Sequence, residues 1–336
     1  MAAIIIDGKK QAEAVLAEVS EGVRRLAGIG VKPALAAIQA NQNPGSDWYV
    51  QAQARHAAAQ GIEHRRTLLP SDAPEKDLLA AVRQASDDPD ISGIIVLTPL
   101  PPGTDHLRLV EAMDPAKDAE GVHPANLGRL MVSGRAEPIP CTAAAARELI
   151  KSVLPDLSGR RALVIGRSAT VGKPLALLLL AENATVSIAH TRSDLWRVAR
   201  EAEIVVAAAG ASGARWRAYN TQWRIWREKG DGRPEHPNLE PLVRVDMVRR
   251  GAVVIDIGDN HIPAGLGQDG GPLLDAKGGA DMRYAGDVDF AKVSEVAGFI
   301  TRPRGGVGPL TNAFLLRNVV RSALLAHGLA PAGAGS

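Results

Sequence analysis

A buried-strand run, Arg161 to Ile165, is followed at once by the segment Gly166 to Pro174, which reads GRSATVGKP and leads into a predicted helix. A strand, a glycine turn and a helix in this order are typical of a phosphate-binding turn. Glycine lets the backbone approach a pyrophosphate, and the helix N-terminus supplies N–H donors and a positive dipole. Pro174 suits the first helical turn, where a backbone N–H would have no partner. Since glycines alone fit a plain strand–helix turn equally well, the prediction depends on the longer string.

Apolar runs with strand composition alternate along the chain with segments of helical periodicity. This alternation predicts an α/β fold with a mostly parallel, doubly wound sheet, and 336 residues are enough for two domains with cores of their own. The predicted strands are Ile4–Ile6, Pro33–Ala40, Ile91–Leu97, Arg161–Ile165, Thr185–Ala189, Ile204–Ala208 and Ala252–Ile257. The predicted helices include Gln11–Leu26, Ser46–Gln60 with Ser46 or Asp47 as its N-cap, and Gly308–Ala326.

Composition argues against several classes of function. The net charge of +2 comes without a basic stripe interleaved with aromatic residues, so we expect no nucleic-acid partner. The longest apolar stretch, Leu175–Ala181, is far too short to cross a bilayer, so no membrane partner is expected, and Met1–Asp7 lacks the pattern of a signal peptide. The single cysteine, Cys141, rules out an internal disulfide and fits a reducing, cytoplasmic setting. The eight histidines are scattered without ligand spacing, so no metal site is predicted.

Four segments taken together resemble a known family. They are Asn43–Gln53, Lys117–Gly121 (KDAEG), Gly166–Pro174 and Arg304–Thr311 (RGGVGPLT). The chain resembles the bifunctional methylenetetrahydrofolate dehydrogenase/methenyltetrahydrofolate cyclohydrolase family of FolD type, over roughly Ile4 to Ala326.

The resemblance implies a homodimer and two α/β domains. In this family the last helix packs back on the first domain, so the folate-binding catalytic domain would comprise residues 1–145 and 308–330. Residues 146–307 would form a Rossmann-type, doubly wound NADP-binding domain with an insertion at about 211–246. The tail at 331–336 consists of small residues and proline and is predicted to be disordered.

The resemblance assigns the dinucleotide to the glycine turn and to two later strand ends. The residues concerned are Gly166, Arg167, Ser168, Val171, Gly172, Gly210 and Ile257. An acid near the end of the second strand would bind a ribose 2′-hydroxyl and repel a 2′-phosphate. Here the first acid after the end of the strand is Asp194, and the strand is followed by Thr191 and Arg192. Together with Arg167 they could bind a 2′-phosphate, which favours NADP over NAD; the alternative is that Arg192 is a solvated loop charge.

The resemblance also places a tyrosine and a catalytic lysine four residues apart, against the pterin and its one-carbon bridge. The tyrosine is Tyr49, but the fourth residue after it is Gln53, and the two share one face of a helix. A glutamine that assists the lysine in this family falls at Leu97, and an aspartate that hydrogen-bonds the pterin falls at Glu120. The substrate-binding positions that are retained are Pro99, Gly305 and Gly306.

The two reactions of the family make different demands on position 53. Hydride transfer to the nicotinamide needs orientation but no protein base, because the product cation is delocalised over two nitrogens. Hydrolysis of that cation needs proton transfer, and general acid–base catalysis speeds such a step by about 10² to 10⁴. Glutamine cannot supply it, because its amide does not titrate. We therefore predict an NADP-dependent methylenetetrahydrofolate dehydrogenase with weak or absent cyclohydrolase activity. His56 or Lys117 could substitute for the lysine, although a surface histidine and a structural lysine are the more ordinary interpretations.

Two alternative functions stay open. Glu120 and Leu97 suggest the same chemistry on a modified pterin carrier. The other alternative is a catalytically silent protein that binds nucleotide and pterin and regulates or scaffolds. Cys141, in the string Pro-Cys-Thr, is interpreted as buried packing, because no histidine is placed to activate it as a nucleophile.

The insertion at about 211–246 combines aromatic and basic residues. Trp216, Tyr219, Trp223 and Trp226 recur at helical spacing, with arginines around them. A helix packed on its own domain is the simpler interpretation. A lid or subunit contact is the alternative, since the segment leaves the ligand edge of the predicted sheet.

Overall fold

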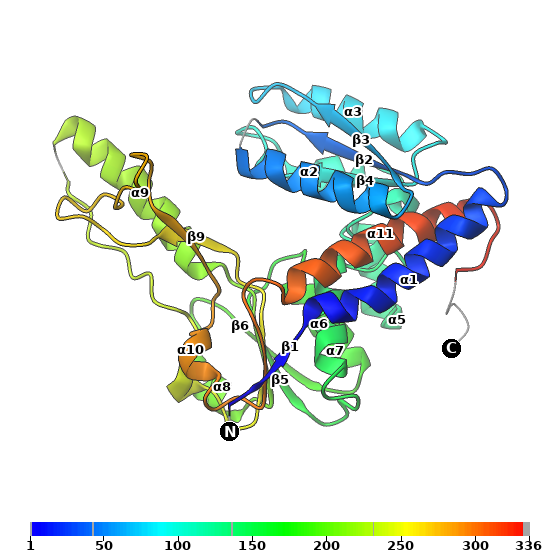
Figure 1. Cartoon of the computed structure of the whole chain (residues 1–336). Coiled ribbons are helices and arrows are strands. Elements are labelled where there is room, and N and C mark those ends of the chain that lie inside the picture. Colours follow the sequence, from blue (N-terminus) through cyan, green and yellow to red (C-terminus); the bar gives the residue numbers. More distant parts are fainter. Residues whose placement is uncertain (1, 42–43, 136, 231, 332–336) are drawn as a thin grey trace. The chain divides into compact units, whose positions relative to one another are not determined.

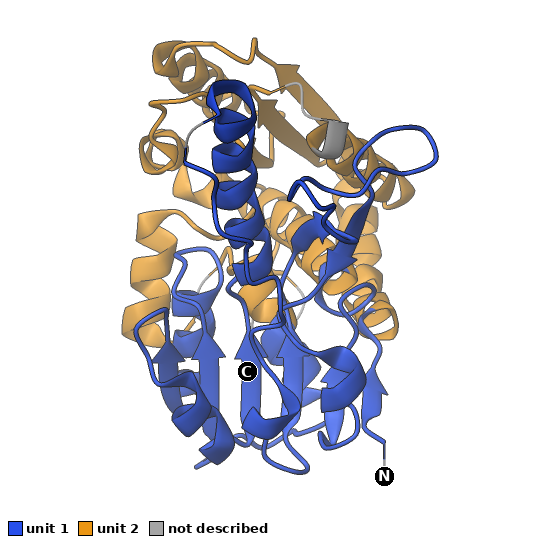
Figure 2. Ribbon diagram, turned by 90° about the vertical axis from the view of Figure 1, so that its left-hand side faces the viewer, with its two compact units in different colours: residues 1–8, 146–308 blue, residues 9–145, 309–336 orange. Residues whose placement is uncertain are grey.

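The computed structural model describes all residues except 1, 42–43, 136, 231 and 332–336. The chain divides into two compact units, coloured in Figure 2. Unit 1 comprises residues 1–8 and 146–308, and unit 2 comprises residues 9–145 and 309–336. The first eight residues therefore belong to unit 1, whereas the sequence placed them with the folate domain. The predicted disordered tail falls almost wholly on residues 332–336, outside the described residues.

Unit 1 contains a parallel sheet, six-stranded in its described residues, in the order β1-β11-β8-β7-β5-β6. The strands are β1 (Ile4–Ile6), β5 (Arg161–Ile165), β6 (Thr185–Ala189), β7 (Ile204–Ala207), β8 (Val253–Asp256) and β11 (Phe299–Thr301). The helices are α7 (Gly172–Ala181), α8 (Leu195–Glu201), α9 (Ala211–Lys229) and α10 (Phe290–Val293), with the 3₁₀ turn η2 (Val245–Met247). Chain order reverses at β5, whose two neighbours are β6 and β7, so the fold has the switch point at which doubly wound sheets bind ligands.

Unit 2 contains a smaller parallel sheet, three-stranded in its described residues, in the order β3-β2-β4. Its strands are β2 (Ala34–Gln39), β3 (Glu63–Leu68) and β4 (Gly93–Leu97). Its helices are α1 (Gly8–Ala27), α2 (Pro44–Ala59), α3 (Glu75–Asp87), α4 (His106–Glu111), α5 (Pro124–Ser133) and α11 (Val307–Ala326), with the 3₁₀ turn η1 (Pro115–Lys117) (Figure 1). Helix α6 (Cys141–Lys151) contains the point at which the chain passes from unit 2 to unit 1. In the part of the chain that the structure describes, no helix is long and apolar enough to cross a membrane.

The predicted strands are confirmed, with ends within two residues of those observed. Strand β3 was not predicted, because EHRRTL is polar and lies at the edge of its sheet, where one side needs no apolar cover. The predicted N-cap of α2 is wrong. The helix begins at Pro44, so Ser46 and Asp47 lie inside it, and the Asp47 carboxylate instead accepts from Gln39 Nε2 at 3.2 Å and pairs with Arg66.

Helix α9 packs on its own unit, as the simpler interpretation of the aromatic spacing predicts. Trp216 and Tyr219 are each 5% exposed and pack with Ile262 of β9 (Asn260–Pro263), which pairs antiparallel with β10 (Met282–Ala285). The hydroxyl of Tyr219 donates to Gly270 O at 2.8 Å. We call residues 211–230 and 260–285 the arm; in Figure 2 its helix extends away from the sheet of unit 1.

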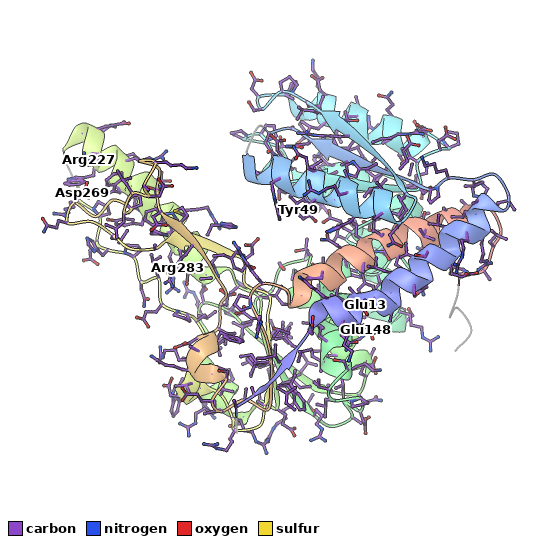
Figure 3. All side chains as sticks on the ribbon, viewed as in Figure 1. Glu13, Tyr49, Glu148, Arg227, Asp269 and Arg283 are labelled. Atoms are coloured by element: carbon purple, nitrogen blue, oxygen red, sulfur yellow. The ribbon has the colours of Figure 1, made fainter. Side chains whose placement is uncertain are left out.

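Near the far end of α9, two polar contacts fix the arm. Trp223 Nε1 donates to Asp269 O at 3.0 Å, and the guanidinium of Arg227 lies 3.7 Å from the Asp269 carboxylate. Figure 3 labels Arg227 and Asp269 on the arm. These contacts join the helix to the loop between β9 and β10, so the arm is one packed substructure.

The aromatic core of the arm can be tested by truncation. Trp216→Ala would leave a large cavity and should cost about 3 to 5 kcal/mol of local stability, whereas Ile225→Ala on the same helix, 47% exposed, should cost little. Amide hydrogen exchange of residues 211–230 measures both. Equal protection in the two variants would contradict the packing described.

Candidate functional site

The glycine turn after β5 requires glycine at two positions. Gly166 has φ +121°, and a Cβ there would lie 2.3 Å from Ala208 O at the end of the neighbouring strand. A Cβ on Gly172 would lie 2.2 Å from Gly166 O. The backbones therefore approach one another too closely for any side chain, and the turn is held at the switch point of the sheet.

Ser168 organises the start of α7. Its hydroxyl oxygen accepts from Val171 N at 3.1 Å and from Gly172 N at 3.3 Å, while Lys173 N donates to its backbone oxygen at 3.1 Å. The serine thus acts as the cap of a helix whose formal N-cap residue, Val171, has no side-chain acceptor. Arg167 is exposed beside it.

The loops after β5 and β6 each expose an arginine side chain, whereas the first acidic side chain after β6 is engaged in capping a helix. Strands β5 and β6 are adjacent, with Ile165 opposite Ala189, so Arg167 and Arg192 follow neighbouring strand ends. Both arginines are exposed, and neither forms an ion pair within the described residues. The first acid after β6, Asp194, caps α8 by accepting from Arg197 N at 3.2 Å. The acid that would select a free ribose hydroxyl is therefore committed to a helix end.

The loop after β7 is held by a buried carboxylate, Asp287, that the sequence analysis did not identify. Asp287 is fully buried and accepts from Ala209 N at 2.7 Å, Gly210 N at 2.8 Å and Ala211 N at 3.1 Å. Asn260 Nδ2 donates to the same carboxylate at 3.1 Å, and Asn260 Oδ1 accepts from Gly213 N at 2.7 Å. The two side chains cap α9 and fix the segment that contains Gly210.

A second buried carboxylate, Asp256, ends β8. It accepts from Gly258 N at 3.0 Å and from the backbone nitrogens of Asp287 and Val288 at 2.9 and 3.1 Å. Burial raises the pKa of Asp256 to about 7, and the charge of Asp287 raises it by a smaller amount. The three backbone hydrogen bonds act in the opposite direction and lower the pKa of Asp256. Ile257, the residue after it, donates to Ala207 O at 2.8 Å. The sequence signal that could have identified Asp256 is an acid at the end of a predicted strand with Gly258 two residues later.

In unit 2, Tyr49 and Gln53 lie one turn apart on α2 (Figure 3 labels Tyr49). Gln53 is 3% exposed, and its Oε1 lies 3.0 Å from Nε2 of His64 on β3. His64 was missed because β3 was not predicted. Burial, then Arg66, lowers the pKa of His64, although its own backbone acts in the opposite direction. His56 is exposed and makes no hydrogen bond with a described residue, which agrees with the surface interpretation.

Leu97 and Pro99 lie where β4 ends. Leu97 is the last residue of the strand, is 6% exposed and lies opposite Gln39 of β2. Pro99 follows a cis peptide bond, and its carbonyl accepts from Asn41 Nδ2 at 2.9 Å. The position of the family glutamine is therefore a buried apolar one.

The KDAEG segment is largely structural. Asp118, 1% exposed, accepts from Gly121 N at 2.9 Å, His123 N at 2.7 Å and Asn126 Nδ2 at 3.0 Å. Lys117 Nζ donates to Ser86 O at 2.6 Å and Asp88 O at 2.7 Å, which confirms a structural lysine.

Glu120 is the member of this segment with an altered acidity. Burial, then the charge of Asp118, raises the pKa of the Glu120 carboxyl from 4.5 to about 8. Burial and the neighbouring Glu120 also raise the pKa of Tyr49, so these two side chains interact electrostatically. At neutral pH Glu120 is therefore mostly a neutral carboxyl that can both donate and accept.

Cys141 behaves as a packing residue. It is 5% exposed, its Sγ lies 3.3 Å from Ala119 O, and Asn318 Nδ2 lies 3.3 Å from the same sulfur. Burial, then Glu120, raises the pKa of its thiol well above the ordinary value, which disfavours the thiolate.

Gly305 and Gly306 lie in unit 1, while the other positions that the family resemblance assigns to the folate lie in unit 2. Gly305 has φ +81° and accepts from Gly8 N at 3.2 Å, and a Cβ on Gly306 would lie 2.4 Å from Arg302 O. Across the described residues, no three histidine, cysteine or acidic side chains gather in a way that could hold a metal ion.

The close approach at Gly166 makes a testable prediction. Gly166→Ala would force a methyl group against the backbone at 2.3 Å. NADPH affinity, measured by fluorescence titration, should fall roughly tenfold or more. A loss of about 1.4 kcal/mol in binding free energy is enough for a tenfold change in Kd. Gly159→Ala is the control, because it has φ +69° but no atom within 4 Å of the new Cβ. Similar affinities in both variants would show that the close approach does not matter.

The raised pKa of Glu120 predicts how stability depends on pH. Its pKa is about 8 in the folded chain and near 4.5 when unfolded, so between these values the folded state holds the extra proton. Its contribution to stability is then lost as pH rises from 5 to about 8 and changes no further above that. Urea unfolding of Glu120→Gln should lack this decline. An identical pH dependence in the variant and the wild type would contradict the assignment.

Comparison with known proteins matches both units. Residues 6–120 match the family "Tetrahydrofolate dehydrogenase/cyclohydrolase, catalytic domain", and residues 140–214 and 239–327 match its NAD(P)-binding domain. The unmatched residues 215–238 lie within the predicted insertion.

Two curated relatives and two solved structures agree with this match. "Bifunctional protein FolD" of Rhodopseudomonas palustris (strain HaA2) is 41% identical over 98% of each chain. "Bifunctional protein FolD 1" of Rubrobacter xylanophilus is 39% identical over 96% of this chain and 97% of its own. The bifunctional enzyme FolD of Campylobacter jejuni has a TM-score of 0.78 at 31% identity, covering 96% of this chain and 99% of that one.

The fourth is the enzyme of Trypanosoma brucei, solved with NADP cofactor and an inhibitor. It has a TM-score of 0.78 at 30% identity, covering 96% of this chain and 97% of that one. With both domains matched and full-length relatives near 40% identity, the chain belongs to the tetrahydrofolate dehydrogenase/cyclohydrolase family.

Proposed function

We propose that this chain oxidises 5,10-methylenetetrahydrofolate to 5,10-methenyltetrahydrofolate with NADP and has weak or no cyclohydrolase activity. Its relatives are bifunctional. The observation that carries the proposal is the environment of position 53, where a buried glutamine, hydrogen-bonded to His64, stands in the place of the catalytic lysine.

The dehydrogenase half needs little from the protein beyond positioning. Bound NADP supplies the hydride acceptor. Gly166, Ser168 and Gly172 would hold its pyrophosphate at the switch point, and Gly210 and Ile257 would lie at the nicotinamide half. Hydrogen bonds fix each of these segments in the free protein, so orientation is built before the substrate binds.

Position 53 lacks a group that can move a proton for the hydrolytic reaction. An amide does not titrate, and Leu97 offers no polar atom to assist it. The Nε2 proton of His64 is donated to Gln53 Oε1, so it is not directed at a substrate. Loss of general acid–base help costs about 10² to 10⁴ in rate.

Charge supports NADP over NAD. Arg167 and Arg192 follow adjacent strand ends without an ion-pair partner in the described residues, and Asp194 is occupied in capping α8. Arginine forms strong bidentate hydrogen bonds with phosphate. The relative from Trypanosoma brucei was solved with NADP. A homodimer in the cytoplasm, with Tyr49, Pro99, Glu120, Gly305 and Gly306 at the substrate, completes the proposal.

A modified pterin carrier is the second candidate, and Glu120 favours it. A carboxyl that is mostly neutral at pH 7 presents a donor as well as an acceptor, unlike the aspartate that the family places there. Higher kcat/KM with such a carrier than with tetrahydrofolate would establish it, and no turnover of any pterin would favour a silent binding protein.

The proposal is tested by two assays on the purified protein and on Gln53→Lys. The wild type should reduce NADP, with lower kcat/KM for NAD, and should hydrolyse methenyltetrahydrofolate weakly or no faster than buffer. Gln53→Lys should gain cyclohydrolase activity, limited by Leu97, so Gln53→Lys with Leu97→Gln should gain more. Cyclohydrolase turnover of the wild type at ordinary enzyme rates would refute the proposal.

A further inference from the structure

The side-chain amide of Gln53 has a hydrogen-bond partner for its oxygen but none for its nitrogen in the part of the chain that the structure describes. Its side chain is 3% exposed, and its Oε1 lies 3.0 Å from His64 Nε2. Because an amide oxygen can only accept, His64 must carry its proton on Nε2 and donate it. The amide nitrogen of Gln53, which has two N–H groups, is buried and finds no hydrogen-bond acceptor among the described residues.

A buried N–H without a partner destabilises the free protein, so native structures seldom keep one. An apolar residue of similar volume at position 53 would remove this cost. Within the described residues Gln39 Oε1 and the Nε atoms of Arg147 and Arg317 are also buried without a partner, and Gln53 is the one of these four that occupies the position of the family's catalytic lysine.

The surroundings of the amide indicate its ligand. Tyr49 lies one turn earlier on the same face of α2, and it interacts electrostatically with Glu120. These are the residues placed at the pterin under the proposed function, on which this inference rests. A neutral amide N–H suits a neutral acceptor, either a ring carbonyl oxygen or a ring nitrogen.

We propose that Gln53 binds substrate by donating from Nε2 to a neutral acceptor of the pterin, and that His64 is the positioning residue that fixes the amide. The imidazole N–H holds Oε1 on its own side, so the NH₂ group faces the ligand. Without His64 the amide can turn over and present its oxygen to an acceptor, which is repulsive. Position 53 thereby keeps a directed donor where the family has lysine, while it loses the group that titrates.

The test is calorimetric titration of tetrahydrofolate into the NADP-saturated protein. Gln53→Met, which removes the donor at similar volume, should raise Kd about three- to tenfold, and His64→Leu should raise it as well. Because His64 acts through Gln53, adding His64→Leu to Gln53→Met should change Kd no further. His64→Gln, which retains an N–H donor, should restore part of the affinity.

His56→Leu, an exposed histidine on the same helix, is the matched control and should leave Kd unchanged. Absence of tetrahydrofolate binding by the wild type would overturn the proposed function together with this role. Binding by the wild type that Gln53→Met leaves unaltered would overturn this role alone. The nitrogen-15 shifts of His64 in the wild type add a measurement that does not depend on a variant: they should report an Nε2–H ring, and an Nδ1–H ring would refute the positioning role.

Discussion

A polar group taken out of water must find a hydrogen-bond partner, and this requirement shapes the ligand-facing loops of both units. In unit 1 it is met by two buried carboxylates. Asp287 receives three consecutive backbone N–H groups after β7, and Asp256 receives the backbone N–H groups of Gly258, Asp287 and Val288. Asp256 N in turn donates to Thr301 Oγ1 at 2.8 Å, at the end of β11. Four segments far apart in sequence are thus held at one edge of the sheet, which gives the nucleotide turn a rigid neighbour.

Most buried polar groups of unit 2 follow the same rule. Asp118 is satisfied by three donors, and Asn318 joins Ala119 O and Ile139 O at 3.0 and 2.9 Å. Gln53 departs from the rule, because only its oxygen is paired, and within the described residues Gln39 Oε1 and Arg317 Nε are also buried without a partner. Among these exceptions, Gln53 occupies the position at which the family resemblance places the catalytic lysine. A fixed neutral donor can orient a substrate for hydride transfer, but it cannot exchange a proton with water during hydrolysis.

Strand positions in the main sheet could be predicted, because a parallel sheet covered on both faces needs short continuous apolar runs. The runs at Arg161–Ile165 and Ile204–Ala207 show this clearly. Strand β3 could not be predicted, since its residues are polar at a sheet edge, and His64 was lost with it. Asp256 and Asp287 were also missed. Their role comes from pairing with backbone groups distant in sequence, which a single sequence does not display. Glu120 was identified by position, but its raised pKa depends on burial.

The central claim is that the dehydrogenase reaction is retained and the cyclohydrolase reaction is weak or lost. It is tested most directly by following both products during one time course with methylenetetrahydrofolate and NADP. The account predicts that NADPH and methenyltetrahydrofolate rise together in nearly equal amounts, and that 10-formyltetrahydrofolate forms at or close to the uncatalysed rate. NADPH formation with little methenyltetrahydrofolate, because 10-formyltetrahydrofolate appears at an ordinary enzyme rate, would contradict it.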